Sequence, residues 1–240
     1  TGNHDTDMVR TRLESKNAAR TAQFIAGMLP GMWYVWQREV LGTPNIDMPD
    51  EYKKDKDIGG RDGERVLMTW NSRYGGGFSE GMIDQILDTI WIERGRDNSD
   101  DVRPDKDISW LNKIDIRYIE NILEEYRKKF WLPPVDQNIA AQDNVELQML
   151  DPKSPYWLTR DIMTMRKKDP VLKQADNLRM LNTDHENVLA FARQDPDNPH
   201  RQIIVIANFS AETTEVAILD AGQSRGRLVM SSLEGKLGAD

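Results

Sequence analysis

The sequence contains no cysteine among its 240 residues. A disulfide framework and a cysteine-ligated metal site within the chain are therefore excluded. Long apolar stretches are also lacking, because no run reaches the roughly 18 residues that suggest a membrane-spanning helix. The fold must therefore depend on ordinary packing of helices and strands.

Positive charge is in deficit as well, with 32 Lys and Arg residues against 40 Asp and Glu residues and a net charge of -8. This balance argues against nucleic acid or an anionic membrane as the main partner. Hydrophobic residues make up 38% of the chain and charged residues 30%, and the mean hydropathy is -0.67. So polar a chain predicts a modest core, and we expect that core to rest partly on surface supplied by another segment.

Apolar spacing predicts a helix at residues 14–29, which ends at Pro30-Gly31. The short apolar run 32–36 follows this stop and is typical of a buried strand. A strand after a helix is the alternation found in a (β/α)8 barrel. Ser154 and Pro155 are a helix start signal. Further helices are predicted at residues 81–94, 114–130 and 155–168.

The hydrophobic period changes near residue 188, after which short apolar runs alternate with polar turns. The pattern predicts four strands, at residues 188–192, 202–207, 214–219 and 227–230. We therefore expect two domains, a barrel portion at residues 1–172 and a small antiparallel β-domain at 173–240. A charged helical insertion occupies about residues 80–130 of the first domain.

A series of short motifs runs along most of the chain outside that insertion. The motifs are Asn3-His4-Asp5, Leu29-Pro30-Gly31, Gln37 with Glu39, Leu41 and Gly42, Gly60-Arg61-Asp62 to Asn71, Gly77-Phe78-Ser79, Trp131-Leu132-Pro133, Asn144 to Gln148, Met165 to Leu172, and Asn208-Phe209-Ser210. Their order and spacing resemble the C-terminal half of alpha-glucosidases (maltases) of the alpha-amylase clan, glycoside hydrolase family 13.

The resemblance implies an α/β fold, the C-terminal part of a (β/α)8 TIM barrel followed by a small antiparallel β-sandwich domain that is incomplete at its end. It also implies that Asp5 is the third catalytic carboxylate of the family, which favours the charged transition state, and that His4 binds hydroxyls of the sugar. A neutral His and an ionised Asp can do this through directional hydrogen bonds. An isolated His-Asp pair is ordinarily a surface turn, but the surrounding motifs favour an active-site origin.

In this family the nucleophile and the general acid/base precede the segment that corresponds to Asn3-His4-Asp5. The resemblance therefore implies that this chain alone lacks glucosidase activity, since loss of a nucleophile removes orders of magnitude in rate. The expected partners are an oligosaccharide substrate and the N-terminal half of the barrel, in the same or a separate chain. No metal or cofactor is expected, and the family implies an extracellular or secretory location.

Several positions depart from the family pattern. Met8 stands where the family has a sugar-binding Arg, Arg38 and Val40 replace a Gly and a Glu, Leu67 replaces a Pro, and Asn71 replaces an Asp. At this position an apolar thioether therefore replaces a charged side chain with several hydrogen-bond donors. The departures together indicate relaxed constraint on the site.

Three interpretations follow. The chain is part of an active alpha-glucosidase, or it is part of a catalytically inactive glucosidase-like binding or assembly protein, comparable to the heavy chains of amino-acid transporters. In the third interpretation, which is compatible with either function, it is one polypeptide of a split protein. The insertion at about residues 80–130 is either a surface for a protein partner or a tolerated surface insertion.

Overall fold

A computed structural model describes residues 2–48, 61–77, 80–98, 100–104, 107–128, 137–220, 226–232 and 235–236. Contacts between Cα atoms divide the chain into two compact units. Unit 1 comprises Thr1–Asn45 with Val145–Asp240, and unit 2 comprises Ile46–Asn144. Phe78-Ser79 and Trp131-Leu132-Pro133, which belong to the motifs above, lie outside the described residues.

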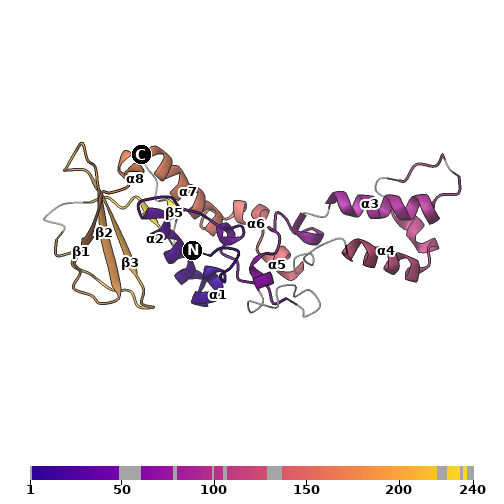
Figure 1. Ribbon diagram of the computed structural model, residues 1–240, viewed down its shortest axis with the longest axis horizontal. Coiled ribbons are helices and arrows are strands. Elements are labelled where there is room, and N and C mark those ends of the chain that lie inside the picture. The colour runs from indigo at the N-terminus through magenta and orange to yellow at the C-terminus, as the bar shows by residue number, and fades with distance from the viewer. Residues whose placement is uncertain are drawn as a thin grey trace. The chain divides into compact units, whose positions relative to one another are not determined.

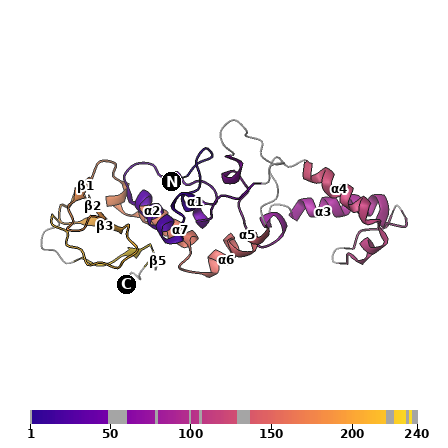
Figure 2. The same cartoon turned by 90° about the horizontal axis from the view of Figure 1, so that it is seen from below.

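Unit 1 contains six helices and a small β-structure among its described residues. The helices are α1 (Val9–Leu13), α2 (Lys16–Met28), the short 3-10 helix η1 (Glu39–Leu41), α6 (Val145–Leu150), α7 (Pro155–Lys168) and α8 (Pro170–Lys173). The strands are β1 (Leu178–Leu181), β2 (Val188–Gln194), β3 (Gln202–Asn208), β4 (Met230–Ser231) and β5 (Gly235–Lys236). α2 packs against α7, as Figures 1 and 2 show.

The two long helices of unit 1 match the sequence prediction. α2 begins after Ser15, whose hydroxyl accepts the Ala18 backbone N–H at 3.3 Å. α7 begins at Pro155 as predicted, but Ser154 makes no side-chain cap hydrogen bond. Its hydroxyl instead donates to the Gln148 carbonyl oxygen at 2.7 Å. The start signal therefore identified the right residue, but the Ser154 hydroxyl bonds α6 and does not cap α7.

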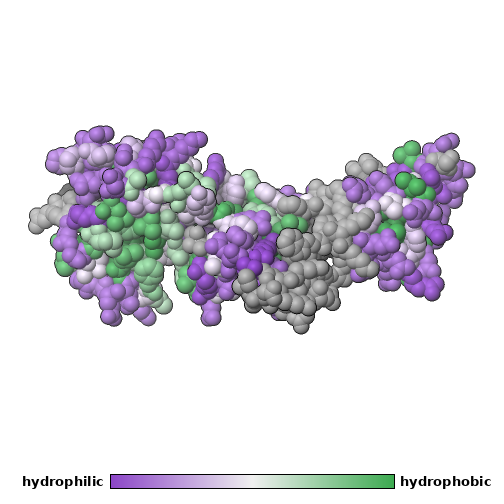
Figure 3. Space-filling model, viewed as in Figure 1, coloured by the Kyte–Doolittle hydropathy of each residue, from purple (hydrophilic) through white to green (hydrophobic). Residues whose placement is uncertain are grey.

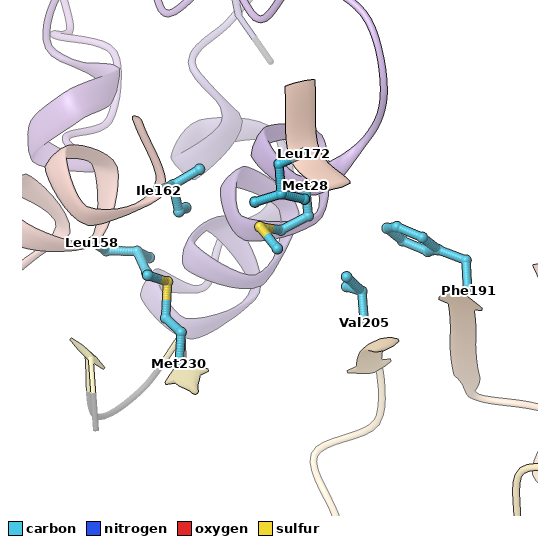
Figure 4. Close-up of a cluster of buried hydrophobic side chains, with 7 residues drawn as sticks. All are labelled: Met28, Leu158, Ile162, Leu172, Phe191, Val205 and Met230. Carbon is cyan, nitrogen blue, oxygen red and sulfur yellow. The ribbon is translucent and has the colours of Figure 1, made fainter. Parts of the chain in front are cut away.

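The core of unit 1 joins both helices to the sheet (Figure 4). Ile162 of α7 is fully buried, and Met28 of α2 lies beside it. Phe191 and Val205 extend from β2 and β3 toward these helices. A fully buried apolar side chain of this size contributes about 1.5–3 kcal/mol. This shared core fixes the sheet against the helices that follow the candidate site.

The strand predictions were partly correct. β2 and β3 match the predicted runs and pair antiparallel, with Phe191 opposite Val205. The predicted strand at 214–219 is wrong, because this segment makes only an isolated bridge from Thr183 to Ile218. Its backbone bonds the segment between β1 and β2, where the Ala217 N–H donates to Asp184 Oδ1 at 2.7 Å.

The last predicted strand is reduced to β4, which pairs with β5. β1, which pairs with β2, was not predicted. The described strands thus form a three-stranded antiparallel sheet in the order β1-β2-β3 and a separate two-stranded pair. Apolar side chains gather on the surface over the three-stranded sheet (Figure 3). Ile206 of β3 is 46% exposed.

The predicted buried strand at residues 32–36 is also wrong as a description of this structure. The segment is extended coil, and Met32 and Tyr34 are 78% and 75% exposed. A parallel barrel strand depends on neighbours on both sides. Among the described residues, none forms a strand that pairs with this segment.

Unit 2 consists of helices and turns in the residues described. Its helices are η3 (Arg61–Glu64), η4 (Tyr74–Gly77), α3 (Glu80–Ile90), the π-helical turn η5 (Trp91–Gly95), η6 (Ser109–Lys113), α4 (Ile116–Lys128) and α5 (Gln137–Gln142). α3 with η5, and α4, confirm the two helices predicted for the insertion. They lie side by side in Figure 2.

The insertion has an apolar cluster of its own. Ile90 of α3 and Trp110 are buried, and the ring of Trp91 meets that of Trp110 edge-on with centroids 5.0 Å apart. Gly95 lies against both rings, because a Cβ there would come within 2.7 Å of Trp91 and 2.8 Å of Trp110. A segment with such packing is an ordered helical element and not only a charged loop. Nowhere in the described residues is a helix long and apolar enough to span a membrane.

Candidate functional site

A tight turn at the start of unit 1 carries the two predicted site residues. Asn3 organises this turn, because its Oδ1 accepts the Asp5 backbone N–H at 2.7 Å and the Thr6 hydroxyl at 3.2 Å. The Asn3 backbone N–H donates to Thr6 Oγ1 at 3.2 Å. Asn side chains stabilise turns through such local bonds. His4 and Asp5 therefore lie at the tip of a turn whose shape is set by the residues on either side.

The structure brings the His4 and Asp5 side chains together. His4 Nε2 lies 3.1 Å from Asp5 Oδ2, and the two side chains are 61% and 45% exposed. The His4 ring also lies against the Trp36 ring, with centroids 5.9 Å apart. An exposed imidazole and carboxylate present hydrogen-bonding atoms that a polyhydroxylated ligand can use. The predicted roles of the two residues in sugar binding and catalysis stay predictions.

Asn45 anchors the chain that leaves this turn, and sequence reasoning missed it. Its Oδ1 accepts the Met8 backbone N–H at 2.8 Å, and its Nδ2 donates to Asp7 Oδ1 at 2.6 Å. The Asn45 backbone N–H donates to Thr11 Oγ1 at 2.7 Å. One residue thus fixes the chain on both sides of the start of α1.

Glu39 forms a second and deeper anchor. Its Oε1 accepts the Val9 backbone N–H at 2.8 Å, and the residue is 2% exposed. Gly2 lies directly on this carboxylate, because a Cβ at Gly2 would come within 2.5 Å of Glu39 Oε1. Glu39 belongs to one of the motifs that carry the family resemblance, but the resemblance implied no role for it. Its partners lie about thirty residues away in sequence and could not be identified from the pattern.

Two of the departing positions are enclosed by the fold. Met8 and Arg38 are both 0% exposed. Arg38 adopts a left-handed backbone conformation, with φ of 66°, which suits a glycine better than a residue with a Cβ. Its Nη2 donates to the Pro44 carbonyl oxygen at 3.2 Å. Neither side chain is available at the surface beside His4 and Asp5.

A hollow of about 300 Å³ lies elsewhere on unit 1, along one face of α7. Its lining residues are Val40, Tyr156, Thr159, Arg160, Met163, Thr164 and Lys167. Neither His4 nor Asp5 lines it. Among the described residues, no group of three or more His, Asp and Glu side chains could hold a metal ion.

No protein-family model matches the sequence, and no curated protein matches it in a sequence comparison. Solved structures do match its fold. An alpha-glucosyl transfer enzyme, XgtA, is 22% identical over 88% of this chain, with a TM-score of 0.56. The trehalose-6-phosphate hydrolase TreA of Bacillus licheniformis is 18% identical over 93%, with a TM-score of 0.58. A trehalulose synthase, MutB, is 16% identical over 88%, with a TM-score of 0.58.

This chain covers 31%, 36% and 34% of the lengths of these three structures, or about a third of each. All three are TIM-barrel enzymes of glycoside hydrolase family 13. At this low sequence identity, the similarity supports a shared fold but not a shared activity. The motif order predicted the same family from the sequence. The chain has the fold of a part, about a third, of the enzymes of the alpha-amylase family, glycoside hydrolase family 13.

Proposed function

We propose that the chain supplies the sugar-binding part of a site in a glycoside hydrolase that acts on alpha-linked glucosides. The observation that carries this proposal is the exposed His4-Asp5 pair, with Nε2 and Oδ2 3.1 Å apart, on a turn fixed from both sides. In the proposed site His4 binds sugar hydroxyls. Asp5 bonds hydroxyls of the same sugar and favours its distorted, positively charged transition state.

The covalent chemistry of such an enzyme requires two further carboxyl groups, a nucleophile and a general acid/base. We propose that the N-terminal half of a (β/α)8 barrel provides them, in the same polypeptide or in a separate one. Residues 1–172 then form the C-terminal part of that barrel, and residues 173–240 belong to a β-sandwich domain that follows it. The exposed Met32 and Tyr34 support this arrangement, since the packed interior of a barrel and the helices around it would cover the side chains of a barrel strand.

Titration with maltose tests the proposal directly. We expect saturable binding by the complete protein, measured by calorimetry, and its loss in His4→Ala and Asp5→Asn. His200→Ala and Asp197→Asn are matched controls, because both residues are exposed on a different turn of unit 1. Equal effects of the site and control variants, or no binding by the complete protein, would reject the proposed site.

The intact mass of native material, with N-terminal sequencing of each band, identifies what completes the site. A larger chain or a co-purifying chain with two further active-site carboxylates predicts maltose hydrolysis by the assembled protein. Turnover of maltose by the 240-residue chain, pure by mass spectrometry, would contradict the assignment of the covalent chemistry to another segment.

A second candidate is a catalytically inactive glucosidase-like protein retained for binding or assembly. The burial of Met8, at 0% exposure, favours it. At the position of a sugar-binding Arg, this chain has an apolar side chain turned into the protein. This candidate predicts no saturable binding of maltose or acarbose by the complete protein, together with a protein partner for the helical insertion at about residues 80–130.

A further inference from the structure

Both ends of the turn that carries His4 and Asp5 lie against one carboxylate oxygen, Glu39 Oε1. On its upstream side, Gly2 packs so closely on Glu39 Oε1 that a Cβ would come within 2.5 Å of this atom. On its downstream side, the Val9 backbone N–H donates to the same Oε1 at 2.8 Å. The two ends of the turn therefore share a single contact atom.

Val9 needs this acceptor. It is the first residue of α1, so its N–H has no acceptor within the helix. Met8 precedes the helix and provides no side-chain cap hydrogen bond. Val9 is only 4% exposed, and a buried N–H without a partner costs about 1–3 kcal/mol. The carboxylate of Glu39 supplies the missing cap from a distant part of the sequence.

Glu39 is itself held in place. It is 2% exposed, its backbone N–H donates to the Trp36 carbonyl oxygen at 3.1 Å, and its own carbonyl oxygen accepts a hydrogen bond from Gln23 Nε2 of α2. Trp36 is the residue whose ring lies 5.9 Å from the His4 ring. The same short segment thus fixes the base of the turn through Glu39 and contacts its tip through Trp36.

We propose that Glu39 is a positioning residue for the His4-Asp5 pair, because its Oε1 sets the distance between the two ends of the turn that carries them. The consequence for sugar binding rests on the function proposed above, whereas the positioning itself does not. Asn45 supports the same turn at Asp7 and Met8. These two bonds of Asn45 lie on the downstream side of the turn, whereas Glu39 Oε1 contacts both ends, so we expect Glu39 to have the larger effect.

Histidine NMR signals test the positioning without any sugar. The chain has three histidines, His4, His185 and His200, so their ring signals are readily resolved and the latter two report on the rest of unit 1. We expect Glu39→Ala to shift the His4 ring signals and remove the NOE between the His4 and Trp36 rings. Glu39→Gln keeps a carbonyl acceptor for the Val9 N–H and should keep the NOE.

Gly2→Ala provides a second variant that leaves the carboxylate intact, in case Glu39→Ala does not fold. The added Cβ displaces the upstream end from Oε1, so the His4 signals should shift as they do in Glu39→Ala. Unchanged His4 signals in the folded variants would overturn the proposal. A uniform shift of all three histidines would overturn it too, because that result indicates a general loss of structure.

Maltose binding by the same variants of the complete protein connects positioning to function. We expect Glu39→Ala to weaken binding about tenfold, or about 1.4 kcal/mol, and Glu39→Gln to bind as the original protein does. Wild-type affinity in a variant whose His4 signals have shifted would overturn the proposal. If the original protein binds no maltose while the NMR result holds, the proposed function fails and the positioning of the turn stands.

Discussion

Arg193 of β2 donates a hydrogen bond from Nη1 to the carbonyl oxygen of Met28, the last residue of α2, at 2.9 Å. The guanidinium is fully buried and also donates to the carbonyl oxygens of Val171 and Gln174 and to Asn177 Oδ1. Burial lowers the pKa of Arg193, and the neighbouring charge of Arg166 adds to this effect. Carbonyl acceptors thus hold a buried cation where the sheet meets the helices.

Replacement of Arg193 should therefore strongly destabilise unit 1. We expect Arg193→Ala to lower the free energy of unfolding by about 3 kcal/mol or more, since several buried carbonyl groups lose their donor. Urea unfolding measures the change. Arg179→Ala is the matched control, because Arg179 is exposed on the adjacent strand, and it should change stability by less than about 0.5 kcal/mol. Equal losses in the two variants would contradict this role for Arg193.

The elements that were predicted correctly depend on local sequence. The helix predicted at 155–168 coincides with α7 because Pro155 and the helical spacing of Leu158 and Ile162 are features of a single segment. The strand predicted at 32–36 failed because a barrel strand requires neighbours that no described residue provides. Local pattern was sufficient for the longer helices and for β2 and β3, which follow each other in sequence and pair antiparallel. It was insufficient for a strand whose neighbours must come from distant segments.

The candidate site likewise combines features that local sequence predicts with features that it does not. His4 and Asp5 are adjacent in sequence, so their proximity could be predicted from it. The anchors could not, because Asn45 bonds Met8 across 37 residues and Glu39 bonds Val9 across 30. The burial of Met8 also depends on this long-range packing. The sequence revealed the departure from the family at Met8 but not that its side chain is enclosed.

Met8 provides a test of whether the family's arginine can be restored. We expect Met8→Arg to lower the free energy of unfolding by about 3 kcal/mol, because it puts a charge into a site with 0% exposure. Met8→Leu keeps the volume and apolar character and should change stability by less than about 1.5 kcal/mol. Thermal or urea unfolding provides the measurement. Stability near that of the original protein, with stronger maltose binding, would show instead that an arginine here can reach the His4-Asp5 pair.

The insertion has an ion-pair arrangement that can be tested separately. Arg103 Nε lies 2.5 Å from Asp88 Oδ1, and its Nη2 lies 3.1 Å from Asp84 Oδ1. Both carboxylates are more than half exposed, so the stabilisation should be modest and sensitive to salt. We expect Arg103→Ala to lower the free energy of unfolding by about 1 kcal/mol at low salt, and by less at about 1 M salt.

Arg117→Ala is the control for these ion pairs. Among the ion pairs of the described residues, Arg117 pairs only with Asp115, the residue before α4, and its side chain is 83% exposed. Its effect should be close to zero at either salt concentration. A loss at Arg103 that does not depend on salt would indicate that the packing of its aliphatic part, and not its charge, stabilises α3.

Gly27 and Ile162 offer the sharpest test of the core. A Cβ at Gly27 would come within 2.5 Å of Ile162 Cγ2, although Gly27 lies within α2, where alanine is intrinsically favoured. We expect Gly27→Ala to lower the free energy of unfolding by about 1–3 kcal/mol through overpacking. In an Ile162→Ala background the obstructing methyl group is gone, while the Trp33 ring stays 3.1 Å from the added Cβ. The same substitution should then cost less than about 1 kcal/mol. Additive effects in this double-mutant cycle would mean that α2 and α7 do not approach each other as closely at this point as the structure places them.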